Sequence, residues 1–451
     1  MATQIVLLSA NTHREPYAVY PLGTAYLKCY LDNNLPNSIV EVFDMNTNST
    51  QDLQAYLVEK SVDFVCISIR NVDGANSLDR RGFLPQYKKI VDAVKEVTSV
   101  PIIIGGAGFS IFPSLFMQEM DADYGISGEG ERALCNLITA LKNNTSVDFI
   151  PKLYRKSERV NKLECNYIEL PQSKYETDLV EYYWHESGML NIQTKRGCPY
   201  KCIYCTYPQI DGSKVRCMNI DSIVETIAKA KRDFGANYWF FTDSVFNIKN
   251  SYNIKLAQAL IDSGVDIQWG AYFSPSNITD EQMALFKASG LTHIEFGTES
   301  FCDETLESYG KHFTYEDVLK SSKIALKNNI FYSHFLILAG WGETQAHLEE
   351  TIRNSKQLEY TVIFPYVGMR IYPNTILHKS MLESNLLLPD DTLLEPSYYI
   401  TEGFNLEHTK QLAKATEKAW IFPDEPTDNL VNVLKYKRKK KGPLWEYLRK
   451  P

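Results

Sequence analysis

The chain has 451 residues, a formal net charge of −8 and a pI of about 5.6. Its composition, 44% hydrophobic and 23% charged, is that of a globular protein with ample core. The acidic balance argues against a large nucleic-acid surface, and no segment approaches the roughly 20 apolar residues that cross a bilayer. We therefore expect a cytoplasmic protein with no nucleic-acid partner, no membrane span and no signal peptide.

Residues 1–145 alternate short apolar strands with helices. The pattern predicts strands at 4–10, 38–45, 62–69, 100–106 and 122–128, and helices at 21–31, 86–97 and 129–142. Such alternation indicates a flavodoxin-like, doubly wound parallel sheet covered on both faces. Ligands of these sheets bind beyond the carboxyl ends of the strands, so the turns at 11–17, 70–77 and 105–110 are candidate ligand loops.

The pattern restarts after a polar linker at 146–188. Residues 189–389 contain six further strand–helix repeats, with strands at 189–195, 236–244, 266–273, 292–300, 331–340 and 361–371. Six repeats predict a partial (β/α)6 barrel with chemistry at the carboxyl ends of its strands. Residues 390–451 are a small C-terminal appendage. We read its basic run, Lys435 to Lys441, as a solvated tail, with an anion contact as the alternative.

Three cysteines carry the strongest chemical signal. Cys198, Cys202 and Cys205 follow the first of these six strands with the spacing C-x3-C-x2-C. Three thiolates on one loop can hold a [4Fe–4S] cluster and leave its fourth iron open to a small molecule. A zinc site that adds Cys217, in a binding protein without turnover, is the alternative. Most of the remaining cysteines are expected to be buried small hydrophobic residues.

The cysteine segment, RGCPYKCIYC, resembles the cluster loop of the radical S-adenosylmethionine (SAM) enzymes. FTDSVFN, IEFGTES, FLILAGWGET and YVGMRIYPNT resemble later motifs of the same family, and the resemblance spans about 190–385. It implies that the three cysteines ligate the cluster. In the fifth-strand turn, Trp341 stands where the family usually has proline.

The same resemblance assigns residues to SAM. It implies that Tyr204 lies near the adenine, that Asp243 and Ser244 help to hold the amino group, and that Gly297 and Glu299 lie near the ribose and the methionine end.

The first domain resembles the cobalamin-binding domain of the cobalamin-dependent (class B) radical SAM enzymes, on VCISIRNVDG and IIIGGAGFS. The resemblance implies a cobalamin site formed by Ser68, Asn71, Gly105, Gly106 and Gly108. The D-x-H-x-x-G motif, whose histidine ligates cobalt, is missing, so we read His13 in NTHREPY as a surface histidine. A domain that binds no cobalamin and gates substrate instead is the alternative.

Together these resemblances imply an enzyme that cleaves SAM reductively to a 5′-deoxyadenosyl radical. Its electron would come from an external one-electron reductant such as flavodoxin or ferredoxin. The implied reaction is cobalamin-dependent methylation of a small-molecule substrate, which consumes two molecules of SAM for each methyl group. The alternative is a radical SAM rearrangement, an oxidation, or transfer of a non-methyl part of SAM.

Overall fold

The computed structural model describes residues 2–14, 17–156, 158–160, 163, 170, 172, 174–424, 433 and 441–449. The described residues divide into two compact units. The first falls within Met1–Gly74, Arg81–Tyr182 and Thr206–Gly212, and the second within Ala75–Arg80, Tyr183–Cys205 and Ser213–Pro451. Most of the basic run, residues 435–440, lies outside the described residues, as does Cys165.

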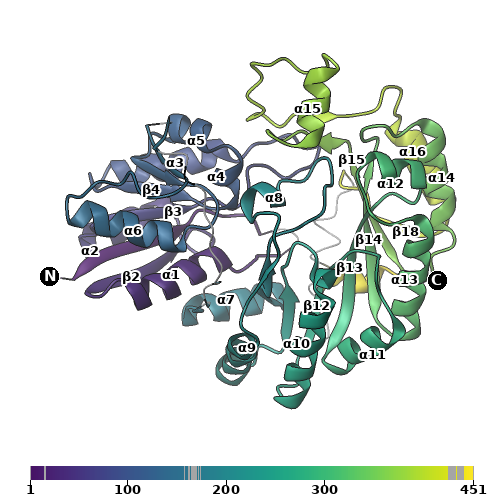
Figure 1. Ribbon diagram of the computed structural model, residues 1–451, viewed down its shortest axis with the longest axis horizontal. Coiled ribbons are helices and arrows are strands. Elements are labelled where there is room, and N and C mark those ends of the chain that lie inside the picture. The colour runs from purple at the N-terminus through teal and green to yellow at the C-terminus, as the bar shows by residue number, and fades with distance from the viewer. Residues whose placement is uncertain are drawn as a thin grey trace. The chain divides into compact units, whose positions relative to one another are not determined.

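The first unit contains a sheet with the strand order β2-β1-β3-β4-β5-β6-β7 (Figure 1). Its strands are β1(Thr3–Ser9), β2(Ser38–Asp44), β3(Phe64–Ser68), β4(Ile102–Gly105), β5(Tyr124–Ile126), β6(Leu153–Arg155) and β7(Glu158–Arg159). The first five are parallel. Their order 2-1-3-4-5 is the flavodoxin-like one, which confirms the predicted fold. The antiparallel pair β6 and β7 was not predicted.

Helices cover both faces of this sheet. On one face α1(Leu22–Asn34) and α6(Glu131–Lys142) bury their apolar sides in a shared core with alternate residues of the strands. On the other face lie α2(Thr50–Lys60), α3(Leu84–Lys95) and α5(Pro113–Met120). The unit also contains the short helices α4(Ala107–Ile111) and α8(Tyr207–Ile210). The helix α7(Thr177–Ser187) lies at the chain junction of the two units.

The second unit contains an open parallel sheet with the order β18-β15-β14-β13-β12-β11-β8 (Figure 1). Its strands are β8(Leu190–Ile192), β11(Tyr238–Phe241), β12(Gln268–Phe273), β13(Leu291–Glu299), β14(Phe331–Leu338), β15(Val362–Val367) and β18(Ala419–Trp420). Six of them are the predicted strands in chain order, so the partial barrel is confirmed. The edge strand β18, from the predicted appendage, was not foreseen.

Helices pack on the outside of this sheet, among them α9(Ile220–Phe234), α10(Asn250–Asp262), α11(Asp280–Ala288), α12(Asp303–Ser308), α13(Tyr315–Lys327), α14(Gln345–Ser355) and α16(Leu406–Lys414). Side-chain capping fixes where several begin. Thr314 and Asp317 form a capping box at α13, and Asn219 caps α9. The helix α15(Ile376–Glu383) follows the short hairpin strand β16(Met369–Arg370), which pairs with β17(Tyr398–Tyr399).

Alternation along the strands separates an outer face from an inner one. On β12, Trp269 packs against Phe286 of the outer helix α11, whereas Tyr272 contacts Phe240 on the inner face. The 3-10 helix η2(Leu444–Leu448) lies against this inner face. Its Trp445 is buried, stands edge-on to the ring of His293 and donates to Glu295 Oε1 at 3.0 Å. The C-terminal segment is therefore part of the barrel core.

Within the described ranges, we find no helix with both the length and the apolar character needed to span a membrane.

Candidate functional site

The three-cysteine loop begins where the first barrel strand ends. After β8, the chain passes through β9(Lys195–Arg196), which pairs with β10(Arg216–Cys217), and turns at Gly197 with φ of +93°. That conformation favours glycine. Cys198 is buried, Cys202 and Cys205 are half-buried, and none of the three is in a disulfide bond. The loop thus lies at the carboxyl edge of the sheet, where barrel chemistry is expected.

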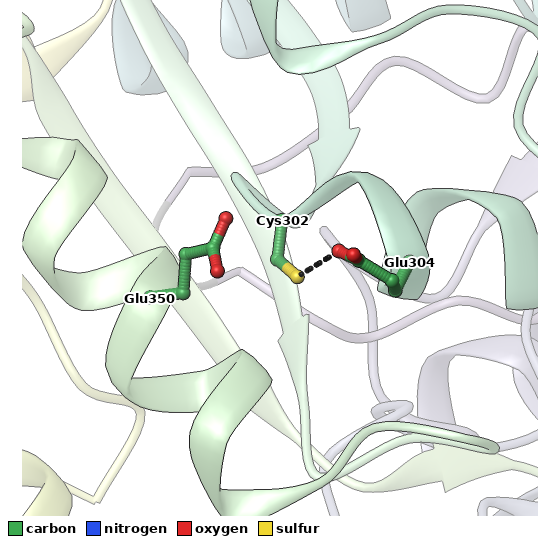
Figure 2. Close-up of side chains that lie close together, drawn as sticks. All are labelled: Cys302, Glu304 and Glu350. Carbon is green, nitrogen blue, oxygen red and sulfur yellow. Dashed lines mark hydrogen bonds between the residues drawn. The ribbon is translucent and has the colours of Figure 1, made fainter.

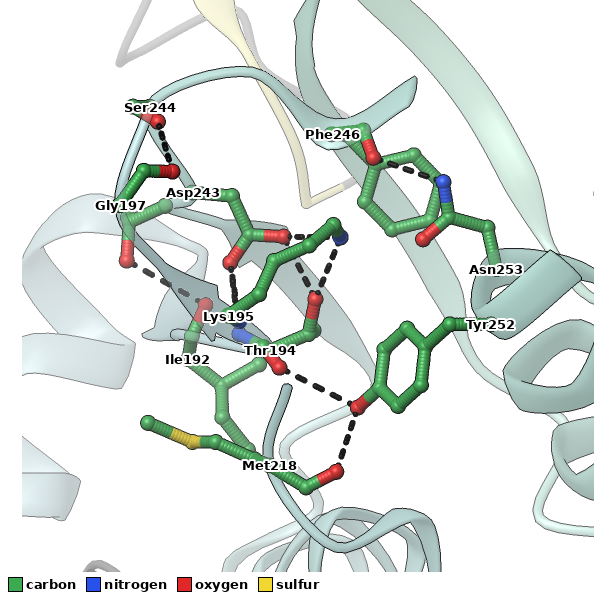
Figure 3. A network of polar contacts seen from close by, with 11 residues as sticks. Ile192, Thr194, Lys195, Gly197, Met218, Asp243, Ser244, Phe246, Tyr252 and Asn253 are labelled. Carbon is green, nitrogen blue, oxygen red and sulfur yellow. Dashed lines mark hydrogen bonds and ion pairs between the residues drawn. The ribbon is translucent and has the colours of Figure 1, made fainter. Parts of the chain in front are cut away.

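A buried ion pair anchors the start of this loop (Figure 3). The side chains of Lys195 and Asp243 are 2% and 1% exposed, and their charged atoms lie 2.6 Å apart. Asp243 also accepts hydrogen bonds from the backbone N–H groups of Thr194 (2.6 Å) and Lys195 (3.0 Å) and from the Thr194 hydroxyl (2.5 Å). Both of its carboxylate oxygens are therefore bound within the protein. In the structure, Asp243 joins the end of β11 to the base of the cysteine loop.

The neighbouring residue, Ser244, reaches the loop itself. Its hydroxyl lies 3.5 Å from the Gly197 carbonyl and hydrogen-bonds the Cys198 thiol. Burial raises the pKa of that thiol, whereas Ser244 and Lys311 lower it. The predicted residues Asp243 and Ser244 are thus brought to the cysteines.

A second polar cluster joins Tyr204 to the end of β13. The Tyr204 hydroxyl donates to Glu299 Oε1 at 2.7 Å, and the Lys311 ammonium lies 3.1 Å from the same oxygen. Lys311 also donates to the Tyr204 hydroxyl (3.1 Å) and to the Gly297 carbonyl (3.2 Å). Three residues predicted to contact SAM, Tyr204, Gly297 and Glu299, therefore lie together at one edge of the sheet.

The local backbone at this cluster is unusual. Glu299 has φ of +70°, which is rare for a residue with a side chain, and the β13–β14 register shifts between Gly297 and Glu299. A Cβ placed on Gly297 would meet only Glu299 Oε1, at 3.7 Å, an ordinary contact. The protein's own packing does not require a glycine here, which fits a position kept clear for a ligand.

A further stack holds the middle of the cysteine loop. The rings of Tyr200 and His312 lie 3.7 Å apart and nearly parallel, and the Nε2 atom of His312 hydrogen-bonds the hydroxyls of Ser274 and Ser276. Burial, followed by the charge of Lys311, lowers the pKa of His312 to about 4, so this imidazole is neutral. It joins the end of β12 to the loop.

Hydrogen bonds and an aromatic contact hold the turn after β14. The Glu343 carboxylate accepts from the Ala339 N–H, and burial raises its pKa to about 8. The Tyr309 hydroxyl accepts from the Gly340 N–H at 3.0 Å, and Trp341, at the usual proline position, packs 5.0 Å from the ring of Tyr399.

The zinc alternative is not favoured by the position of Cys217. The residue is paired with Lys195 across β9 and β10, and the charged groups that act on it are Lys195, Lys249 and Asp243. For Cys198, in contrast, burial raises the pKa of the thiol and the charge of Cys202 raises it further. Cys198, Cys202 and Cys205 lie on one loop, and it is their spacing that fits a cluster with one open iron.

Another group of potential metal ligands lies elsewhere (Figure 2). Ligand atoms of Cys302, Glu304 and Glu350 lie within 4.8 Å of one another. The Cys302 thiol donates to Glu304 at 3.1 Å, and burial raises its pKa to about 11. A protonated thiol that donates to a carboxylate at the first turn of α12 is a structural contact.

The residues predicted to bind cobalamin lie at the carboxyl edge of the first unit's sheet. Ser68 ends β3, Asn71 follows it, and Gly105 ends β4. Gly106 has φ of +99°, and a Cβ there would lie 2.5 Å from the Ile69 carbonyl, so glycine allows the two loops to meet.

A main-chain hydrogen bond joins the loops after β3 and β4. The Gly108 N–H donates to the Ile69 carbonyl at 3.0 Å, and Gly108 is buried. Ser68 and Asn71 are half-buried, and in the described part of the chain their side chains make no hydrogen bond. Polar side chains left free on a glycine-rich edge fit a large polar ligand such as cobalamin. His13 is exposed, in agreement with its interpretation as a surface histidine.

Sequence reasoning missed Lys311, His312 and Tyr309. They follow the fourth-strand motif in SYGKHFT, and no spacing rule in a single sequence marks them. A glycine followed by Lys-His was the available signal, and it is weak. Their importance arises from tertiary contacts with a loop about 100 residues earlier in the chain.

Comparison with known proteins identifies a domain in each half of the chain. Residues 192–354 match the model of the radical SAM superfamily, and residues 10–138 match the B12 binding domain. Tryptophan 2-C-methyltransferase of Streptomyces laurentii is 23% identical over 437 residues, covering 82% of this chain and 72% of that protein.

Solved structures are also similar. Kitasatospora setae TsrM, a radical SAM methyltransferase with tryptophan and a SAM analogue bound, aligns with a TM-score of 0.88 at 19% identity, over 99% of this chain and 97% of that one. The cobalamin-dependent SAM radical enzyme OxsB, with aqua-cobalamin and SAM bound, aligns with a TM-score of 0.72 at 17% identity, over 92% of this chain and 66% of that one. This chain therefore contains a radical SAM domain preceded by a B12 binding domain, the combination found in the cobalamin-dependent radical SAM enzymes that it resembles.

Proposed function

We propose that this enzyme methylates a small molecule, with SAM as the methyl source and cobalamin as the carrier. One observation supports this most directly: a single chain combines a three-cysteine loop and its SAM-binding edge with a B12 binding domain. A radical rearrangement or oxidation would need only the first of these, so methylation accounts for more of the molecule.

Some of these residues are proposed to hold the cluster and its loop, and others to bind SAM. We assign Cys198, Cys202 and Cys205 to the cluster. When bound, the cluster supplies a low-potential electron, SAM the reacting groups and cobalamin a methyl carrier. The ion pair of Lys195 with Asp243, together with the hydrogen bonds from Thr194, engages both carboxylate oxygens and fixes the start of the loop.

Tyr204 and Glu299 are the proposed SAM-binding pair. The Glu299 carboxylate can accept from ribose hydroxyls or from an ammonium group, and its second oxygen, Oε2, is the one that neither Tyr204 nor Lys311 contacts. The Tyr204 ring offers an apolar surface for a base. Gly297 leaves room beside them.

The substrate that we propose is a small molecule with an aromatic body. Phe240 and Tyr272 are in contact on the inner face, and Phe335 and Phe364 stack with centroids 5.0 Å apart. Tyr272 is 39% exposed despite its place in the barrel. Aromatic rings suit a planar apolar partner. Because two relatives act on or bind tryptophan, this amino acid is the first candidate to test.

The test is an anaerobic reaction with SAM that carries a deuterated methyl group, a strong reductant, cobalamin and tryptophan. We expect S-adenosylhomocysteine, 5′-deoxyadenosine and a substrate with the labelled methyl group, all measured by mass spectrometry. Absence of S-adenosylhomocysteine would rule out this form of the proposal. Formation of 5′-deoxyadenosine without any methylated product, across a panel of small aromatic candidates, would favour rearrangement or oxidation.

A further inference from the structure

The Lys311 ammonium is buried beside the cysteine loop. Its side chain is 6% exposed and contacts Glu299, the Tyr204 hydroxyl and the Gly297 carbonyl. The rings of Tyr204 and Phe313 lie 5.7 Å from its nitrogen. A buried cation with this many partners is fixed in place and poorly screened by solvent.

The turn that carries Lys311 is attached directly to the cysteine loop. The Ile203 N–H donates to the Tyr309 carbonyl at 3.1 Å. Gly310 has φ of +72°, and a Cβ there would lie 2.7 Å from the Lys201 carbonyl, so only glycine allows this approach. The position of the ammonium relative to the loop is therefore set by main-chain contacts.

The charge of Lys311 acts on all three cysteines. Burial lowers the pKa of this ammonium, but Glu299, Cys202 and Cys205 together raise it above its ordinary value. Burial raises the pKa of Cys198, and the charge of Lys311 partly opposes this shift. Glu299 supplies one negative charge, whereas the cysteine loop supplies three thiolates. The Lys311 ammonium therefore faces more negative charge than its ion-pair partner alone provides.

We propose that Lys311 sets the reduction potential of the cluster by placing a fixed positive charge against its three thiolates. The cluster becomes more negative by one charge when it is reduced, and a nearby cation stabilises that added charge. The electron comes from the external one-electron donor, and Lys311 keeps its proton throughout. This inference rests on the proposed function only in that the cluster is present.

The test compares cluster midpoint potentials without SAM. We would titrate the anaerobic protein with dithionite, follow the reduced cluster by electron paramagnetic resonance, and assay iron and sulfide in each variant. We expect Lys311→Met to lower the reduction equilibrium constant at least tenfold, about 59 mV in a one-electron couple. Lys311→Arg should restore the wild-type potential, because it keeps the charge.

Two further variants serve as controls, and the first of them tests the proposal even if Lys311→Met does not hold the cluster. Glu299→Gln removes a negative charge at the same point and should move the potential in the opposite, positive direction. Lys229→Met removes an exposed charge of α9, whose side chain is 66% exposed, and should change nothing.

An unchanged potential in an iron-replete Lys311→Met variant would overturn the proposal. Should that variant hold no iron, an unchanged or more negative potential in Glu299→Gln would overturn it instead. The potential is read without substrate, so a failure to find methylated product leaves this result independent of the proposed function.

Discussion

Three carboxylates of the barrel each have a specific side-chain partner. Asp243 binds Lys195, Glu299 binds Lys311, and Glu295 accepts from the Trp445 indole. An unpaired buried charge costs several kcal/mol, so each pair restricts which substitutions the site tolerates.

Removing the charge of Asp243 should weaken the fold around the loop. Asp243→Asn leaves the Lys195 ammonium buried without its carboxylate, and we expect unfolding to become easier by about 3–5 kcal/mol. Iron content should fall with it. Denaturant unfolding and an iron assay check this, with the exposed Asp262→Asn as a control that should change stability by less than about 0.5 kcal/mol. Normal stability and iron with weaker SAM binding would instead support a direct SAM contact.

Glu295 should make stability depend on pH. Burial raises its pKa from 4.5 to about 7. Between these values the folded protein keeps a proton that the unfolded chain releases, so the stability contribution falls as pH rises through this window, by on the order of 3 kcal/mol, and is constant above it.

Glu295→Gln removes this titration. Compared with wild type, the variant should therefore be relatively more stable at pH 8 than at pH 5. Unfolding curves at both pH values measure the difference, and the comparison cancels groups such as Glu343 that both proteins share. An equal pH dependence of the two proteins would show that Glu295 is not buried as described.

Local sequence marks the proposed cluster ligands far more clearly than the residues around them. Cys198, Cys202 and Cys205 are recognisable because all three lie on one short loop. The strand-end motif marked Asp243 as a residue that holds SAM, which stays a prediction. Its ion pair with Lys195, 48 residues away, is specified by nothing in a single sequence. Lys311 was missed for the same reason.

At the scale of elements, the short C-terminal helix η2 has an unexpected place. Trp445 is 6% exposed and lies against β13, whereas Tyr447 of the same helix is 42% exposed. The helix therefore presents one residue to the barrel core and another to solvent.

Trp445→Ala should destabilise the barrel by about 3–5 kcal/mol, because it leaves a cavity beside His293 and deprives Glu295 of its donor. Tyr447→Ala is the matched control and should cost less than about 0.5 kcal/mol. Equal thermal midpoints for the two variants would mean that η2 does not stabilise the barrel.

Elements that lie within a clear apolar run were predictable, and elements without such a run were not. The six barrel strands and the five parallel strands of the first sheet show clear apolar runs. β18 has two residues and η2 has five, too few to display a period. Their placement depends on packing against strands far away in the sequence.

At the scale of the whole molecule, the chain combines a B12 binding domain with a radical SAM domain. The parallel sheets present their ligand loops at the carboxyl ends of strands in both units, in agreement with a general property of such sheets. The external reductant stays a prediction.

Iron content and SAM cleavage test the central claim most directly. Protein prepared anaerobically should hold about four iron ions per chain and should convert SAM to 5′-deoxyadenosine under strong reductant. Cys198/Cys202/Cys205→Ala should lose the iron and the cleavage, whereas Cys217→Ala should keep both. Wild-type protein without iron, or a triple variant that still cleaves SAM, would contradict the account.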